Sequence, residues 1–138
     1  MGIVVDSTAF IGAERAGSSV IEILSDLAER FGDQEAAISV VSAYELAHGV
    51  WRASGPRIRA KREEFVEEIL WRVPVRPVTL SIARIAAQID AACRTRGFTV
   101  PTSDLFIAAT ALDLDFSVAT GNLRHFKKIP SLRVLEFD

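Results

Sequence analysis

The chain opens with Gly2-Ile3-Val4-Val5-Asp6-Ser7-Thr8, and this stretch decides the fold. A short, wholly apolar run that stops at a carboxylate is typical of a strand buried on both faces of a parallel sheet. We expect Ser7 or Thr8 to cap the helix that follows. The first eight residues therefore predict an alternating strand–helix protein with an acid where its first strand ends.

The rest of the chain repeats this alternation. Further strands are predicted at residues 36–40, 73–78, 116–120 and 132–137, and helices at 18–31, 42–51, 57–72 and 79–96, with one more that Thr102 or Ser103 caps. Two prolines in 73–78 favour the edge of the sheet. The pattern predicts a single α/β domain over residues 1–138: a three-layer α/β/α sandwich with a four- or five-stranded, mainly parallel sheet.

Three carboxylates lie beside long apolar runs: Asp6, Glu45 and Asp104. In an open α/β sheet, such positions meet at the carboxyl ends of the strands, where ligands bind. Acids gathered there repel one another, and all remain ionised only when a cation joins them. Each has a structural alternative, because Asp6 can cap a helix, Asp104 favours a helix dipole and Glu45 suits a solvated face. Together they predict a divalent-metal site.

Two neighbouring features fit the same site. Gly49 follows Glu45 by one helical turn, which leaves room for a ligand or, equally well, lets a helix pack closely. Thr120-Gly121-Asn122 ends the fourth predicted strand with hydrogen-bonding side chains. Neither His48 nor His125 has a second histidine at zinc-ligand spacing, so we expect His125 at the surface or behind the ligands.

Composition excludes several classes of protein. The chain of 138 residues is 49% hydrophobic, carries a net charge of −2 and has one cysteine, Cys93. These values argue against disorder, against a uniformly basic nucleic-acid binder and against disulfide bonds. Charged residues interrupt every apolar run before membrane-spanning length, and the N-terminus lacks a basic signal-peptide region. We expect a soluble cytoplasmic protein in which Cys93 is a buried structural thiol.

Four motifs in order resemble those of the PIN domains, most closely the VapC toxins of bacterial toxin–antitoxin pairs. They are Asp6-Ser7-Thr8, residues 42–49 around Glu45, residues 101–111 around Asp104, and residues 120–126. The resemblance covers the chain from Ile3 to its last strand. It implies an endoribonuclease that depends on Mg²⁺ or Mn²⁺ and uses Asp6, Glu45 and Asp104 as its acidic residues.

One position departs from the family pattern. PIN domains often carry a fourth acid after the fourth strand, where this chain has Asn122 or His125. One fewer negative charge weakens the case for a permanent two-metal site. We expect Asp6 and Asp104 to coordinate the ion directly, and Glu45 to hold a metal-bound water or a second ion. Ser7, Thr120 and Asn122 are expected to orient these acids.

The basic residues and the family resemblance together predict the substrate and the partners. Arg124, Lys127 and Lys128 adjoin the predicted site and are candidates for RNA phosphate contacts, whereas the basic residues between 52 and 62 suit either RNA or solvent. Wide apolar helix faces and the resemblance imply a homodimer and a small antitoxin protein as partner. The alternatives are a non-catalytic PIN-like interaction module and a phosphatase, although Thr8 replaces the second aspartate of haloacid-dehalogenase-like phosphatases.

Overall fold

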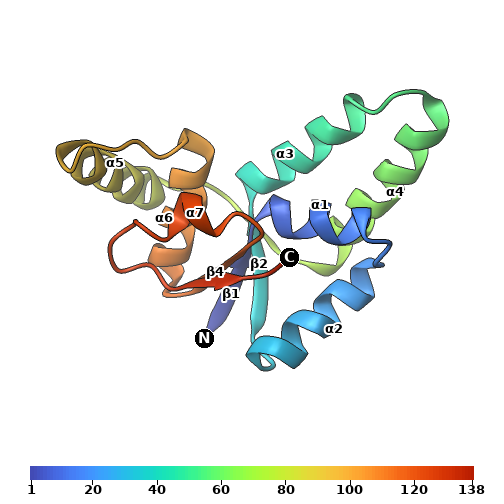
Figure 1. Cartoon of the computed structure of the whole chain (residues 1–138), viewed down its shortest axis with the longest axis horizontal. Helices are drawn as coiled ribbons and strands as arrows, with labels where there is room; N and C mark the ends of the chain where they lie inside the picture. Colours follow the sequence, from blue (N-terminus) through green and yellow to red (C-terminus); the bar gives the residue numbers. More distant parts are fainter.

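The computed structural model describes residues 1–138 as alternating strands and helices (Figure 1). The strands are β1 (Gly2–Val5), β2 (Glu35–Ser39), β3 (Val75–Arg76), β4 (Ser117–Thr120) and β5 (Val134–Glu136). The helices are α1 (Ser7–Arg15), α2 (Val20–Phe31), α3 (Val40–Trp51), α4 (Pro56–Arg72), α5 (Leu80–Thr95), α6 (Thr102–Leu114) and α7 (Leu123–Phe126). No helix has both the length and the apolar content needed to cross a bilayer.

The strands form one sheet in the order β3-β2-β1-β4-β5, and every neighbouring pair is parallel. The predicted parallel sheet is confirmed, with the proline-flanked β3 at one edge. The strand order reverses beside β1, because the chain goes first to β2 and later returns to β4 on the other side. In doubly wound folds, ligands bind in the crevice at the carboxyl ends of the strands next to such a reversal.

Both faces of the sheet are covered, which makes the predicted three-layer sandwich. Ile3 and Val5 of β1 point into a core of 15 buried residues with α1, α2, α3 and α4. Val4 points the opposite way, into a core of 14 buried residues with α5, α6 and α7. The near-equal cores explain why the central strand β1 is apolar at every position rather than at alternate ones. Cys93 is buried in the second core, as expected.

The junction of β2 and α3 lies earlier than the sequence indicates. The strand ends at Ser39, and the helix begins at Val40 rather than at Ser42. The Ser39 hydroxyl accepts a hydrogen bond from the Val41 amide at 3.1 Å and so occupies the N-cap position. Val40 and Val41 favour strands by propensity, but this cap places them in the first helical turn.

The side-chain caps predicted for α1 and α6 are wrong, whereas α2 is capped near its predicted start. Asp6 and Pro101 hold the N-cap positions of α1 and α6, and neither makes a side-chain cap. For α2, Ser19 and Glu22 form a reciprocal capping box, and the hydrogen bonds from Ser19 lower the pKa of the Glu22 carboxyl. The hydroxyls predicted to cap α1 are therefore free for other partners.

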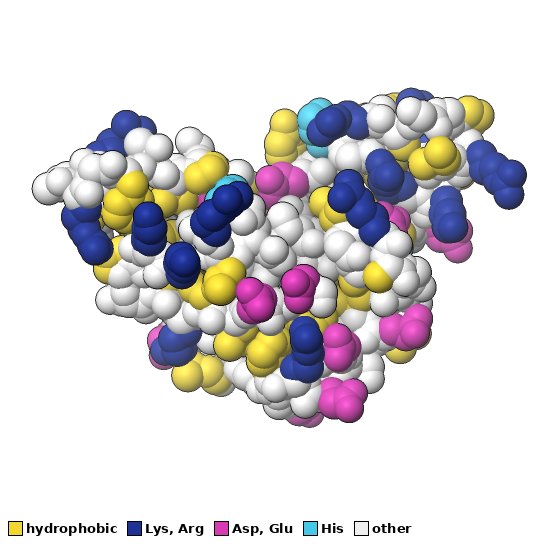
Figure 2. All heavy atoms as spheres, viewed as in Figure 1, with side chains coloured by type: hydrophobic (Ala, Val, Ile, Leu, Met, Phe, Trp, Pro, Cys, Tyr) yellow, Lys and Arg dark blue, Asp and Glu magenta, His cyan; other side chains and the backbone are white.

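Two helical arms flank the carboxyl end of the sheet. Figure 1 shows α3 and α4 as a hairpin on one side, with α5 and the N-terminal part of α6 on the other. Figure 2 shows a hollow between these arms, with lysine and arginine side chains on both arms and acidic atoms at the base of the hollow. The charge distribution thus places an acidic centre between two basic flanks.

Candidate active site

The Asp6 carboxylate lies at the carboxyl end of β1, beside the end of β4. The register pairs Val5 with Ala119, and the Asp6 amide donates to the Ala119 carbonyl at 2.9 Å. Thr8 and Thr120 then both donate hydroxyl hydrogen bonds to Asp6 Oδ2, at 2.6 and 2.8 Å. Only 2% of Asp6 is exposed, so neutral hydroxyls hold this carboxylate in a nearly dry position.

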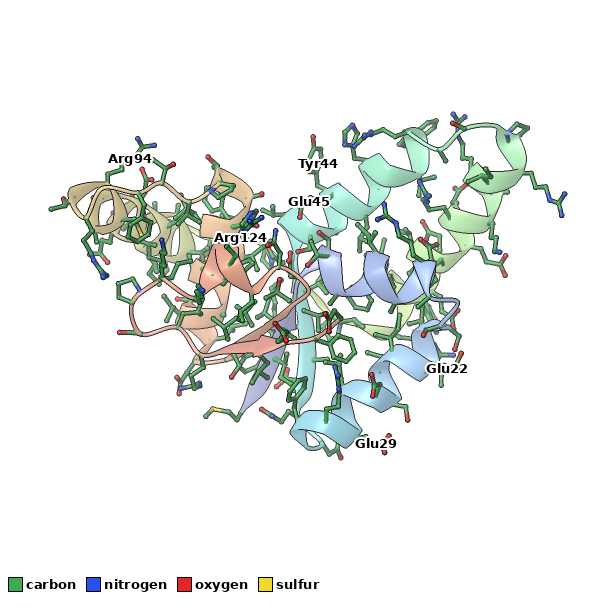
Figure 3. All side chains as sticks on the ribbon, in the orientation of Figure 1. Glu22, Glu29, Tyr44, Glu45, Arg94 and Arg124 are labelled. Carbon is green, nitrogen blue, oxygen red and sulfur yellow. The ribbon has the colours of Figure 1, made fainter.

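The Glu45 carboxylate comes from the second turn of α3. The hydroxyl of Ser7, in the first turn of α1, donates to Glu45 Oε1 at 3.1 Å. Leu46 and Val50 bury the opposite side of α3, which leaves Glu45 facing the hollow (Figure 3). Through this hydrogen bond, Ser7 connects α1 to α3 at the site. The sequence predicts that Ser7 orients the acids but does not specify which one.

The Asp104 carboxylate lies in the first turn of α6, where the helix dipole favours negative charge. His125 Nδ1 is 2.7 Å from Asp104 Oδ2, so this nitrogen donates to the carboxylate. The side-chain amide nitrogen of Asn122 lies 3.1 Å from His125 Nδ1 and 3.2 Å from Nε2. Asn122 thus contacts the imidazole and forms no hydrogen bond with any of the three acids.

Each of the three carboxylates has one oxygen held by a neighbour and one oxygen without a hydrogen-bond partner. Asp6 Oδ1, Glu45 Oε2 and Asp104 Oδ1 are the free oxygens, and none of the three is sealed from solvent. This arrangement fits a divalent cation, because ligand carboxylates in proteins are usually oriented through their second oxygen by surrounding donors. Hard carboxylate oxygens also match Mg²⁺ or Mn²⁺.

The directions of the pKa shifts at Glu45 and Asp104 are consistent with this crowding of negative charge. Burial raises the pKa of Glu45, and the charges of Asp6 and Asp104 raise it further, against the lowering effect of the Ser7 hydrogen bond. Burial also raises the pKa of Asp104, and Asp6 adds to this, while the hydrogen bond and charge of His125 lower it. For both carboxyls, burial and the neighbouring negative charges outweigh the contacts that stabilise the ionised form.

No three His, Cys, Asp or Glu side chains converge closely enough to enclose an ion by themselves. Mg²⁺ commonly takes only one or two protein carboxylates and keeps several waters, so a cage of three direct ligands is not required. The arrangement fits direct contacts from two acids, with the third acting through water. It also has no cluster of histidine and cysteine that would suit zinc.

A basic pocket adjoins the acidic centre on the α5–α7 side. This cavity of about 540 Å³ is lined by Arg94, Phe98, Arg124, His125 and Lys128, among others. Arg124 and Lys128 therefore lie where the sequence predicted basic residues, whereas Lys127 is exposed outside this lining. In Figure 3, Arg124 and Glu45 lie on facing sides of the hollow.

One residue of the acidic centre is not predicted from the sequence: Thr8 is expected only as a helix cap, yet its hydroxyl contacts Asp6 Oδ2. His125 lies behind Asp104, one of the two positions expected for it, but the sequence does not indicate which acid it contacts. The spacing Asp6-x-Thr8 is a weak signal for the first contact. No signal within the sequence links Asp104 to a residue 21 positions later.

The fold and the acidic centre define a class: an α/β protein whose carboxylates meet at the reversal of a five-stranded parallel sheet. The family model for the PIN domain matches residues 3–132. The chain therefore belongs to the PIN domain family.

Individual relatives agree with this assignment. The chain is 30% identical to the Rickettsia felis protein named Ribonuclease VapC1, over 98% of this chain and 96% of the relative. It is 29% identical to Ribonuclease VapC19 of Mycobacterium tuberculosis, over 94% and 95% of the two chains. The VapBC2 structure from Rickettsia felis, bound to a promoter DNA fragment, superimposes with a TM-score of 0.85 at 20% identity over the full length of both chains. The VapBC-5 structure from Mycobacterium tuberculosis has a TM-score of 0.72 at 26% identity, over 99% and 96% of the chains.

Proposed function

We propose that this protein is a Mg²⁺- or Mn²⁺-dependent endoribonuclease that hydrolyses RNA phosphodiesters and acts as the toxin of a toxin–antitoxin pair. The observation that carries the proposal is the set of three carboxylates, each with one oxygen fixed by a neighbour and one oxygen without a hydrogen-bond partner. The names of the relatives support ribonuclease activity. A cytoplasmic location belongs to the proposal, because RNA is available there.

The three acids have different proposed roles in binding the ion. Asp6 and Asp104 are the proposed direct ligands, because both are nearly buried and are anchored through their Oδ2 atoms. Glu45 is more exposed and is the proposed holder of a water or of an ion that arrives with the substrate. Such an ion lowers the pKa of a bound water and stabilises negative charge that develops on a phosphate.

The surrounding side chains keep these acids in place. Ser7, Thr8 and Thr120 supply neutral hydroxyl donors that do not titrate in the working range of pH. His125 holds Asp104, and Asn122 contributes by contacting the His125 ring rather than the ion. Asn122 is therefore proposed as a positioning residue that acts through His125.

Positive charge beside the site supplies the attraction for RNA. Arg124 and Lys128 line the basic pocket next to Asp104, and Lys127 adds charge on the exposed surface. The molecule as a whole is slightly acidic, with a net charge of −2, so local basic patches must provide the phosphate contacts. Binding should consequently weaken as salt concentration rises.

The proposed antitoxin and homodimer surfaces are exposed apolar side chains. Trp51, Ile58 and Trp71 are exposed on the α3–α4 hairpin, and an apolar segment of a small antitoxin is their proposed partner. Val75 and Leu80 are exposed around the edge strand β3, where a second copy of the chain is the proposed neighbour. An isologous pairing is the common arrangement for such a dimer.

The test is cleavage of single-stranded RNA by the purified full-length protein with Mg²⁺, with Mn²⁺ and with a chelator. We expect metal-dependent cleavage that leaves 5′-phosphate and 3′-hydroxyl ends, because a metal-activated water attacks the phosphate. Asp6→Asn is the inactive control. A protein that binds RNA but never cleaves it would instead be a non-catalytic interaction module. Cleavage that persists in chelator with 2′,3′-cyclic phosphate ends would exclude the proposed chemistry.

A further inference from the structure

We propose that the cavity between α1, α3 and α4 is the subsite for one unpaired base of the RNA, next to the phosphate that is cleaved. This inference rests on the proposed ribonuclease function and adds a recognition site to it. The cavity, called the α1–α3–α4 cavity below, lies on the side of the acidic centre opposite the basic pocket of Arg124 and Lys128.

The cavity begins at the acidic centre itself. Its volume is about 500 Å³, within the range of ordinary small-molecule sites. Ser7, Thr8 and Glu45 line its inner end, and Ile11, Leu46 and Phe65 contribute apolar lining. A strand of RNA with a phosphate at the acids therefore has an adjacent cavity with apolar lining within reach of the next base.

An aromatic pair forms part of the lining. The rings of Tyr44 and His48 are stacked, with centroids 5.8 Å apart and planes only 7° from parallel. Tyr44 is 67% exposed although its ring is large and partly apolar. It directly precedes Glu45 in α3, lines the cavity, and projects from the helix away from the sheet (Figure 3). Exposed, pre-stacked aromatic rings are the usual platform for unpaired RNA bases.

The charges around the cavity favour a nucleotide over an uncharged ligand. Arg15, Arg52 and Arg62 line it, against Glu14 as the one acid other than Glu45. Arg62 is fixed in place, because it donates to the Gly49 carbonyl at 3.0 Å and its Nε lies 4.0 Å from Glu14. Arg15 and Arg52 form no hydrogen bond or ion pair and are available for phosphates on either side of the base.

Gly49 keeps the cavity open. It lines the cavity one turn after Glu45, and a Cβ built on it meets no atom within 4 Å. Close helix packing, which was the alternative reading of this glycine, therefore does not require it. Glycine also weakens a helix interior by about 1 kcal/mol relative to alanine. What distinguishes Gly49 is its place in the lining, where the absent side chain leaves space that a ligand can use.

The first test measures binding of fluorescent single-stranded RNA oligonucleotides in the Asp6→Asn background, which keeps the RNA intact. A series of oligonucleotides carries one abasic nucleotide at successive positions around the cleavage site. We expect a single position at which base removal weakens binding roughly tenfold, the size typical of one stacked base. Tyr44→Ala should cause a similar loss and abolish the effect of that abasic position, whereas Tyr44→Phe should preserve both.

Trp71→Ala is the matched control for exposed aromatic area, because Trp71 is 87% exposed on α4 and does not line the cavity. It should leave RNA binding unchanged. If Tyr44→Ala and Trp71→Ala behave alike, or if the abasic series shows no preferred position, the inference is overturned. Cleavage by the otherwise unaltered protein is recorded in parallel, so a failure of the ribonuclease proposal is seen separately.

The second test introduces a larger side chain into the lining of the cavity. Gly49→Leu should raise the KM for RNA at least about tenfold, by the same stacking estimate, and should not lower the melting temperature. Gly12→Leu is the control, because Gly12 is also helical with open space around it and lies outside this cavity. If Gly49→Leu spares RNA cleavage but prevents capture of the antitoxin, the cavity belongs to the antitoxin and the inference is wrong.

Discussion

Asp6 and Asp104 belong to the same acidic centre but are held by different chemistry. Two threonine hydroxyls fix Asp6: Thr120 is positioned by the register of β1 and β4, and Thr8 by the first turn of α1. On the helix side, a single imidazole holds Asp104, and an amide from Asn122 contacts that ring. Asp6 is therefore held by two neutral hydroxyl groups, whereas Asp104 depends on a single imidazole.

The largest expected effect tests whether both regions contribute a direct ligand to the ion. Asp6→Asn and Asp104→Asn should each lower kcat/KM for RNA about 10³-fold or more, because loss of a direct metal ligand removes several kcal/mol of charge stabilisation. Cleavage kinetics and circular-dichroism melts on the same samples measure this. The apo fold should be as stable as before, since removing one of several like charges relieves repulsion. Near-normal cleavage by either variant would refute the assigned ligands.

The next prediction tests the hydrogen bonds that threonine hydroxyls donate to Asp6. Thr120→Val should weaken Mn²⁺ binding about 10- to 100-fold, the range typical for loss of a residue that orients a ligand. Thr120→Ser should restore most of the affinity because it keeps the hydroxyl. Thr110→Val is the control, since Thr110 is equally buried but donates to the Phe106 carbonyl away from the site. Calorimetric titration decides, and equal losses at both threonines would mean a general packing effect.

A smaller effect concerns the missing fourth acid. His125→Asp should tighten Mn²⁺ binding about tenfold, because a unit charge about 4 Å from an ion contributes roughly 1 to 4 kcal/mol at the dielectric of a protein surface or of water. Asn122→Asp should change the affinity less, since the Asn122 side chain contacts His125 and no carboxylate. The apo form of His125→Asp should melt at a lower temperature, because it adds a like charge. Tighter binding by Asn122→Asp would place that side chain at the ion instead.

The smallest effect is a pH dependence of the metal-free protein. The pKa values of Glu45 and Asp104 are raised in the folded state, so the folded protein binds protons more readily than the unfolded chain. Their destabilising contribution is fully present above the raised folded values and disappears below the ordinary values of about 4. Urea unfolding in chelator should therefore show a gain in stability from these groups as pH falls from neutral through their raised pKa values toward about 4.

Glu45→Gln separates this contribution from the rest of the protein. The variant should show a flatter stability profile over the same pH range, because one of the two shifted groups is gone. Mn²⁺ affinity should fall over that range, since protons compete with the ion for Glu45 and Asp104. An unchanged profile in Glu45→Gln would mean that its raised pKa does not affect folding.

Local patterns were sufficient for most of the architecture. The wholly apolar run of β1 and the short, mainly small and apolar segment of β4 indicated strands buried on both faces, and the 3.6-residue periodicity indicated the helices between them. Element ends were less predictable. Val40 and Val41 belong by composition to a strand, and only the Ser39 cap assigns them to α3. Thr102 and Ser103 were predicted as caps by residue type, but Pro101 occupies the position.

By itself, the sequence determined the alternating α/β fold, the family and the three acids, because these depend on periodicity and on motifs of a few neighbouring residues. Only the tertiary structure decided which hydroxyl or imidazole holds which acid. Thr120 reaches Asp6 across 114 positions and His125 reaches Asp104 across 21, through strand pairing and helix packing. Hydrogen bonds act over about 3 Å in space, and separation along the chain carries no information about that distance.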